Sequence, residues 1–274
     1  MTPKDVIIVG NGLFGSIAAT LCRSRGHNVT VVSNNEPMAA SKASGCVLAP
    51  SWLTSLNKTD VDHGLRLLDE LYGLQDVVFT GPLGAPFKAQ RVDPDRVRVK
   101  ADVTADVTSV KDGAVALNDG RTLRGTVLVA AGVWCGRLVE MPPIRGLYGA
   151  SMRFKATGVQ AKISVYAPYR QSVLFQLNKT EAWGGDGTAL IRKTWEAERD
   201  NRIAATVQRI TKLSELRQLQ GVKVTEGIRP YVEEHKAGFF KRISPRTFVS
   251  TGGAKNGTLL AAAQALRFVE EGRL

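Results

Sequence analysis

The sequence predicts a mixed α/β fold, with both α/β and α+β character: a domain with a parallel sheet, built from separated segments, plus a smaller antiparallel-sheet domain. Three observations support this. A glycine-rich turn joins an apolar strand to a helix at the start of the chain. A strand-rich stretch runs from about residue 144 to 192. A strand, a glycine pair and a helix close the chain, so one domain combines the first and last segments.

The first element is a β-α-β unit. Residues 5–10 (DVIIVG) form the continuous apolar run of a buried parallel strand. Apolar residues with helical spacing predict a helix over Leu13–Arg25, which Gly26 ends. The second strand is expected over His27–Ser33. The unit has the usual length of about 30 residues.

The turn Gly10-Asn11-Gly12-Leu13-Phe14-Gly15 has the pattern GxGxxG between strand and helix. The first glycine makes the tight turn, the second lets the backbone approach a pyrophosphate, and the third packs helix against strand. The helix N-terminus then offers free N–H groups to the phosphates. This predicts a Rossmann-like dinucleotide site.

The end of the second strand departs from the usual pattern. An acidic residue normally binds the adenosine ribose there. Ser33 occupies this place, followed by Asn34, Asn35 and Glu36. A serine can hydrogen-bond a ribose hydroxyl, and Glu36 is a second candidate to reach the ribose. The carboxylate missing from the usual place leaves NADP open as a rival cofactor.

The remaining elements follow from the same periodicities. Amphipathic helices are expected over residues 61–73 and Trp195–Leu219, and a closing helix over about 257–271. Residues 96–129 predict a hairpin or meander with a turn at Asn118-Asp119-Gly120. Further strand-like runs cover residues 145–154, 161–167, 172–177, 188–193 and 247–251.

The formal net charge is +12, and it is unevenly distributed. Residues 1–140 carry 15 Lys/Arg and 14 Asp/Glu, whereas residues 141–255 carry 20 and 9. One interpretation is a solvated basic surface that aids solubility. The other is a polyanionic partner, because clustered Lys and Arg neutralise phosphates.

Composition excludes several classes. No segment approaches the roughly 20 apolar residues that cross a bilayer, so no membrane partner is expected. The first residues run directly into a strand, which is unlike a signal peptide. Cys22, Cys46 and Cys135 have no disulfide or metal spacing, so a cytoplasmic protein without a metal site is expected. We assign no catalytic role to the three histidines.

Three further segments resemble one known family. Residues 40–50 (ASKASGCVLAP) resemble the small-residue loop of the D-amino-acid oxidase superfamily, most closely its glycine oxidase branch. Residues 127–134 (VLVAAGVW) resemble its strand-to-turn motif, and residues 250–261 (STGGAKNGTLLA) its closing motif. Together the motifs cover about a third of the chain, in the family's order. This resemblance implies FAD as the cofactor.

In that family the last helix directs its N-terminus at the flavin, where it would stabilise negative charge on the reduced ring. The motifs imply these cofactor-binding residues: Gly10, Gly12, Leu13, Phe14, Gly15, Ser33, Asn34, Ser41, Lys42, Ala43, Ser44, Gly45, Val47, Val107, Ala130, Ala131, Gly132, Trp134, Gly252, Gly253, Ala254, Lys255, Asn256, Gly257 and Thr258.

The substrate site also follows from the resemblance. Residues 227–231 (GIRPY) are similar to the glycine oxidase segment whose arginine binds the substrate carboxylate, a task suited to the guanidinium fork. Arg229, Tyr231 and Lys255 are therefore expected to position the substrate while a hydride moves to flavin N5. The alternative is that Arg229 merely pairs with Glu226 or Glu233. The resemblance implies an FAD-binding domain of residues 1–56, 96–142 and 244–274, and a substrate domain of residues 57–95 and 143–243.

The basic surplus suggests a nucleic-acid partner. The chain also resembles flavoenzymes that process carboxymethylaminomethyl-uridine in tRNA or hypermodify phage thymine. The expected reaction is cleavage of a C–N bond in a glycine-like amine on a DNA or RNA base. Aromatic residues of the basic region, including Tyr148 and Trp183, are core residues or a base-stacking platform. Two rivals remain: oxidation of a free amine such as glycine or sarcosine, and a non-catalytic flavin-binding scaffold.

Overall fold

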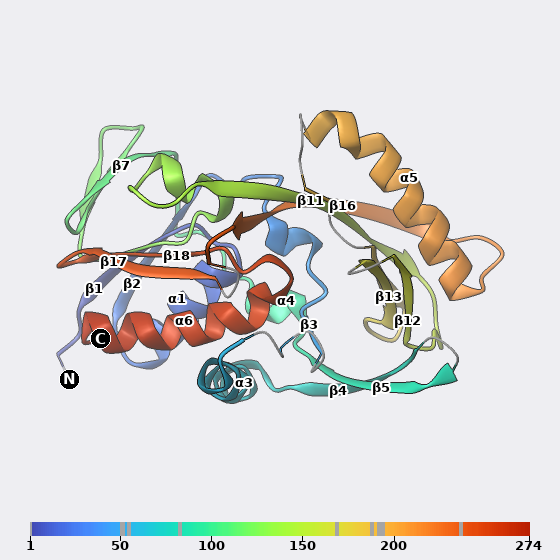
Figure 1. Cartoon of the computed structure of the whole chain (residues 1–274). Coiled ribbons are helices and arrows are strands. Elements are labelled where there is room, and N and C mark those ends of the chain that lie inside the picture. The colour runs from blue at the N-terminus through green and yellow to red at the C-terminus, as the bar shows by residue number, and fades with distance from the viewer. Residues whose placement is uncertain are drawn as a thin grey trace.

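The computed structural model describes residues 2–49, 53, 56–81, 84–167, 170–186, 189–190, 195–235 and 238–274. It contains a mostly parallel sheet at one end and an antiparallel sheet at the other (Figure 1). Both termini lie at the parallel-sheet end (Figure 1). The mixed α/β fold predicted from the sequence is confirmed.

The parallel sheet has the strand order β17-β18-β10-β1-β2-β6. Pairing is parallel from β18 to β6, and β17 is antiparallel to β18. Its strands are β1 (Asp5–Val9), β2 (Asn28–Ser33), β6 (Val103–Thr104), β10 (Thr126–Val129), β17 (Phe239–Ser244) and β18 (Thr247–Thr251). Ile8 and Leu128 are buried on one face and Ile7 and Val127 on the other, which explains why these strands are continuously apolar.

Helices α1 (Leu13–Ser24), α3 (Lys58–Tyr72) and α6 (Gly257–Gly272) pack together under this sheet (Figure 1). Gly64 of α3 lies against Leu259 of α6, where a Cβ would be 2.9 Å from the leucine side chain. Leu67, Leu68 and Tyr72 therefore join the core beneath the parallel sheet. Helix α3 lies within residues 57–95, the first segment of the expected substrate domain, and packs on α6 of the expected FAD-binding domain.

A small antiparallel sheet follows the glycine-rich unit. It consists of β7 (Val107–Lys111), β8 (Ala114–Leu117) and β9 (Thr122–Arg124) in that order. The turn between β8 and β9 lies at Asn118–Gly120, as predicted, and Gly120 adopts a left-handed φ of 87°. This meander leads directly into β10.

The second sheet has the order β15-β11-β14-β13-β12-β4-β5-β3, with β16 on the other edge of β11. Its strands are β3 (Val47–Leu48), β4 (Gln75–Thr80), β5 (Pro86–Arg91), β11 (Ile144–Lys155), β12 (Lys162–Ala167), β13 (Arg170–Gln176), β14 (Glu181–Asp186), β15 (Ala189–Leu190) and β16 (Gln220–Val232). Helix α5 (Trp195–Ser214) packs on β11, β13 and β14. The short helix α4 (Pro94–Val97) lies near α1.

The antiparallel region differs most from the sequence predictions. Helix α5 ends at Ser214 rather than Leu219, because Glu215 adopts a left-handed φ of 59°. Strand β14 was not predicted, since Gly184 and Gly185 look like a turn. Gly184 instead makes room for α5: a Cβ there would lie 2.5 Å from Ile210. Part of the strand predicted over 188–193 lies outside the described residues.

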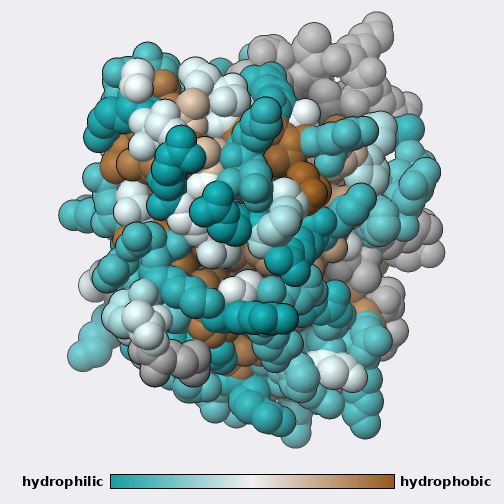
Figure 2. All heavy atoms as spheres, turned by 90° about the vertical axis from the view of Figure 1, so that its left-hand side faces the viewer, coloured by the Kyte–Doolittle hydropathy of each residue, from teal (hydrophilic) through white to brown (hydrophobic). Residues whose placement is uncertain are grey.

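The face of the molecule at the parallel-sheet end is mostly hydrophilic, with hydrophobic residues visible between polar side chains (Figure 2). No helix in the described part of the chain is long and apolar enough to cross a membrane.

Candidate active site: a cavity between the two sheets

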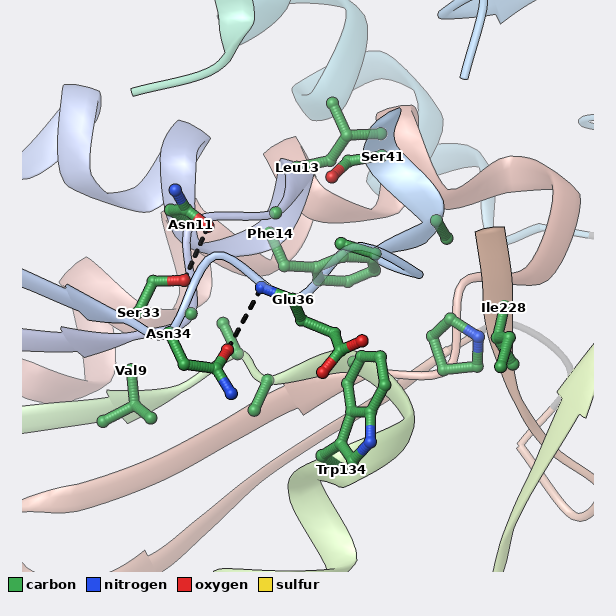
Figure 3. Close-up of a pocket in the computed structure, with 18 of the residues that line it drawn as sticks. Val9, Asn11, Leu13, Phe14, Ser33, Asn34, Glu36, Ser41, Trp134 and Ile228 are labelled. Atoms are coloured by element: carbon green, nitrogen blue, oxygen red, sulfur yellow. Dashed lines mark hydrogen bonds between the residues drawn. The ribbon is translucent and has the colours of Figure 1, made fainter. Parts of the chain in front are cut away.

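A cavity of about 420 Å³ lies at the carboxyl ends of the parallel strands, where ligands bind in open α/β sheets. The glycine-rich turn, the ends of β2 and β10, and the start of α6 form one side. Residues of β16, from the other sheet, form the opposite side. Figure 3 shows Phe14, Glu36, Trp134 and Ile228 around it.

The glycine-rich turn has the geometry that phosphate binding requires. Gly10 adopts a φ of 103°, and a Cβ there would lie 2.5 Å from the Ala130 carbonyl oxygen. Gly12 is the N-cap of α1 and has no side-chain cap. A Cβ on Gly15 would lie 1.8 Å from the Gly10 carbonyl oxygen. The uncapped N–H groups of α1 therefore remain available to an anion.

The end of β2 forms a hydrogen-bonded loop. The Ser33 hydroxyl is buried and donates to Asn11 Oδ1 at 2.9 Å. The Asn34 amide donates to Asp106 Oδ1 at 2.9 Å. Glu36 follows, with its carboxylate side chain directed into the cavity beside Trp134 (Figure 3).

The small-residue loop contains the short 3-10 helix η1 (Ala40–Ala43), which packs against β16. Ser41 and Ser44 line the cavity. Lys42 does not, and its Nζ donates to the Asn35 carbonyl oxygen at 3.1 Å. Gly45 lies against the Trp183 ring, at 3.0 Å from a Cβ position. The loop thus joins the dinucleotide turn to the antiparallel sheet.

Cys46 in the same loop is buried with a left-handed φ of 51°. Burial raises the pKa of its thiol, with hydrogen bonds from Ser44 and Thr258 opposing the shift. A protonated buried thiol is a poor nucleophile, which argues against covalent attachment of a cofactor here.

The remaining cofactor motifs line the same cavity. Residues of η3 (Gly132–Arg137) and the first turn of α6 line it. The Thr251 hydroxyl donates to the Gly132 carbonyl oxygen at 3.0 Å, which holds the two motifs together. Helix α6 has no side-chain N-cap and no acidic residue in its first turn, so its partial positive charge is not neutralised locally.

The structure thus brings most predicted cofactor-binding residues to one cavity. Those that line it are Gly10, Gly12, Leu13, Phe14, Ser33, Asn34, Ser41, Ser44, Val107, Ala130, Ala131, Gly132, Trp134, Gly253, Ala254, Gly257 and Thr258. The others do not line it: Gly15, Lys42, Ala43, Gly45, Val47, Gly252 and Asn256. The Lys255 side chain lies outside the described residues.

Arg229 also lines the cavity, at the end of β16 that faces the dinucleotide turn. It is half-buried, and burial lowers the pKa of its guanidinium. No ion pair to it occurs among the described residues. Glu226 instead binds Arg199 at 2.8 Å and Tyr148 at 2.5 Å, and Glu233 binds Arg145 at 2.9 Å. The alternative that Arg229 pairs with Glu226 or Glu233 is therefore wrong.

Two other expectations are less well supported. Tyr231 does not line the cavity; its backbone forms a bridge with Gly253, which fastens β16 to the start of α6. Tyr148 and Trp183 are buried, so these two rings are core residues and not a base-stacking platform.

Sequence reasoning missed several lining residues, including Asp106, Arg137 and Pro230. Glu36, a candidate ribose ligand from the sequence, stands three positions beyond the place of the usual acidic residue and also lines the cavity. No cluster that could hold a metal ion occurs in the part of the chain that the structure describes.

A glycine turn at a helix N-terminus, on the carboxyl edge of a parallel sheet, defines a dinucleotide-binding protein. The model of the FAD binding domain family matches residues 5–147, about half of the chain. The chain belongs to this family, and FAD rather than NADP is its cofactor. A search of characterised protein sequences found no match.

Solved structures share the fold. Glycine oxidase from Geobacillus kaustophilus is 15% identical with a TM-score of 0.73, over 100% of this chain and 95% of that one. Iminodiacetate oxidase from Chelativorans sp. BNC1 is 14% identical with a TM-score of 0.73, over 95% and 93%. Glycine oxidase from Bacillus cereus ATCC 14579 is 15% identical with a TM-score of 0.71, over 98% and 97%.

Proposed function

We propose that this protein is an FAD-dependent oxidoreductase that oxidises a glycine-like amine whose carboxylate binds Arg229. The observation that carries the proposal is Arg229 itself: a half-buried guanidinium in the cofactor cavity, without an ion-pair partner among the described residues. An arginine stays protonated at neutral pH even when its pKa falls. Such an arginine is suited to a carboxylate from outside the protein. The similar folds of glycine and iminodiacetate oxidases support the proposal.

Bound FAD supplies a two-electron acceptor. The residues of the chain then need only to hold the substrate, so that the C–H bond beside a neutral amine points at the acceptor. The C–H bond breaks as a hydride leaves, the amine becomes an imine, and water hydrolyses the imine C–N bond. The N-terminus of α6 would stabilise the negative charge that accompanies reduction.

The test is anaerobic reduction of the bound flavin by free glycine, sarcosine and iminodiacetate. Loss of the visible flavin absorbance with one of these supports a free-amine oxidase. Stable flavin colour with every amine, including those on nucleic acid, would support the non-catalytic scaffold instead.

We further propose that the amine is attached to a nucleic-acid base. The support is a group of basic residues at the far end of the antiparallel sheet, which we call the basic tip: Lys155, Lys179, Lys212, Arg217 and Lys223. All five are exposed. None makes an ion pair with another described residue, whereas neighbouring Lys162 binds Glu215 at 2.6 Å.

Topology gathers the basic tip in one place. Strands β11 and β13 end there, and β12, β14 and β16 begin there. Lys155 lies opposite Gln220, and Lys223 lies opposite Arg153. From Lys223, β16 runs to Arg229, about 20 Å away at ~3.3 Å per residue. A nucleic acid bound at the tip would thus have a base within reach of the cavity, and a duplex base would have to flip out.

Binding of unmodified DNA and RNA tests the basic tip separately from the chemistry. Replacing its five residues by Gln should weaken nucleic-acid binding at least tenfold. The slope of log binding constant against log salt concentration should become shallower by up to about 0.9 per lost phosphate contact. The matched control replaces five exposed basic residues elsewhere: Arg25, Arg66, Lys100, Lys111 and Arg124. Equal losses in both variants, or binding indifferent to salt, would contradict the proposal.

A further inference from the structure

The ribose end of the cofactor site has an unusual chemistry in this chain. In most dinucleotide sites a carboxylate at the end of the second strand accepts protons from the ribose hydroxyls. Ser33 stands at that place. Its hydroxyl proton goes to Asn11 Oδ1 at 2.9 Å, and its oxygen accepts the Asn35 N–H at 3.0 Å. With these contacts Ser33 is committed to the loop and cannot substitute for a carboxylate.

We propose that Glu36 supplies the missing carboxylate and binds the adenosine ribose of FAD. Glu36 is half-buried and lines the cavity together with Ser33 and Asn34. One of its oxygens accepts the Met38 N–H at 3.3 Å, and its other oxygen has no partner among the described residues. In Figure 3 its carboxylate points into the cavity, toward the Trp134 ring.

The loop holds Glu36 in this position from several directions. Asn35 adopts a left-handed φ of 58°, which turns the chain back after β2. The Glu36 N–H donates to Asn34 Oδ1 at 3.1 Å, while the Asn34 amide nitrogen donates to Asp106. Lys42 donates to the Asn35 carbonyl oxygen. Asn34, predicted to bind the cofactor, is thereby a positioning residue for Glu36.

Asp106 is the other carboxylate of this part of the cavity. It is exposed and already accepts the Asn34 amide at 2.9 Å. Glu36 and Asp106 together would repel a 2′-phosphate on the ribose. The loop therefore rejects phosphorylated dinucleotides although the usual acidic residue is absent.

The test uses the full chain freed of FAD, titrated calorimetrically with ADP and with 2′-deoxy-ADP. Glu36→Gln should weaken ADP binding about tenfold or more, and should change 2′-deoxy-ADP binding much less. The matched control is Glu70→Gln, which removes an exposed carboxylate of α3 outside the cavity and should leave both affinities unchanged. Ser33→Ala tests the rival ribose ligand and should lose less of the preference for the 2′-hydroxyl than Glu36→Gln. FAD affinity, read from flavin fluorescence, should fall in parallel with ADP affinity.

Two results would overturn the inference. One is an equal loss for both ligands, or no loss, in Glu36→Gln. The other is loss of the 2′-hydroxyl preference in Ser33→Ala instead. Glu36→Asp keeps the negative charge, so it distinguishes loss of charge from a structural effect of the substitution. An ADP affinity between those of wild type and Glu36→Gln supports the inference. An ADP affinity as poor as that of Glu36→Gln, with normal thermal stability, opposes it. None of these readouts depends on the amine substrate.

Discussion

The parallel-sheet region and the antiparallel-sheet region bring different anion-binding groups to the cavity. The parallel-sheet region brings the uncapped N-termini of α1 and α6, whose backbone N–H groups are available to phosphates. The antiparallel region brings an arginine side chain, Arg229. Arg153, Arg199 and Arg209 are each fixed by a carboxylate.

Arg229 differs from these three arginines. Its neighbours on the sheet, Arg145 and Glu226, are both paired, yet Arg229 lines the cavity with no such partner among the described residues. An arginine that the fold leaves unpaired beside a cofactor is more informative about function than the net charge of the region.

The largest effect is expected in the dinucleotide turn. Gly15→Val would place side-chain atoms on the Gly10 carbonyl oxygen, 1.8 Å from the Cβ position. We expect loss of FAD binding and destabilisation by more than about 4 kcal/mol, since backbone must move. Chemical denaturation and flavin content measure both. As a control, Gly26→Ala, with a φ of 82° and open space, should cost only about 1 kcal/mol and retain FAD.

The next largest effect concerns Arg229. Arg229→Gln should lower kcat/KM for a carboxylate-bearing amine by about 10²-fold or more, because loss of a buried charged partner costs about 2–5 kcal/mol. FAD content and thermal stability should not fall. Arg145→Gln, which removes a surface pair with Glu233, is the matched control and should leave kcat/KM near the wild-type value. Comparable activity of the two variants would remove Arg229 from the site.

A stability effect is expected where α5 meets the sheet. The Asp186 carboxylate is buried, accepts the Ser172 hydroxyl and pairs with Arg209 of α5 at 2.5 Å. Asp186→Ala should destabilise the protein by about 2–4 kcal/mol, because it removes a buried carboxylate that accepts from both the Arg209 guanidinium and the Ser172 hydroxyl. The free energy of unfolding measures this. Ser172→Ala should cost less, about 1 kcal/mol.

The smallest effect is a pH dependence where α4 joins β11. Hydrogen bonds from Arg153 hold the pKa of the Asp95 carboxyl below its usual value, and Arg98 adds to this. The stabilisation is complete above the ordinary pKa and is lost as the pH falls through the lowered one. Because Asp95 is half-exposed, it amounts to under about 1 kcal/mol. The free energies of unfolding of Asp95→Asn and wild type should differ at neutral pH and converge in acid.

Prediction from the sequence succeeded where local chemistry decides the structure. A Cβ at Gly10 or Gly15 would clash with the backbone, so the turn requires glycines, and their spacing is visible in the sequence. The parallel strands are also recognisable, because they are apolar on both faces. It failed where tertiary contacts decide. Gly184 lies in a strand because it pairs with Met152 on one side and Leu174 on the other, and α5 ends at a left-handed Glu215 that no helix-stop residue marks.

The site divides in the same way. The motif residues that line the cavity could be predicted from their order in the chain. The absence of an ion-pair partner for Arg229 among the described residues could not be predicted. It depends on Arg199 and Arg145, from distant segments, which pair with the candidate partners Glu226 and Glu233. The sequence offered Glu36 as a candidate, but its position in the cavity depends on the turn at Asn35.

The most direct measurement is anaerobic flavin reduction after mixing the protein with glycine or with glycine-modified thymine DNA, for wild type and Arg229→Gln. We predict that wild type loses its flavin colour with a carboxylate-bearing amine and that Arg229→Gln does so at least about 10²-fold more slowly. With the same amine esterified at its carboxylate, the two proteins should be reduced at equal rates. Flavin reduction at equal rates in the two proteins with the carboxylate-bearing amine, or none with any amine, would contradict this prediction.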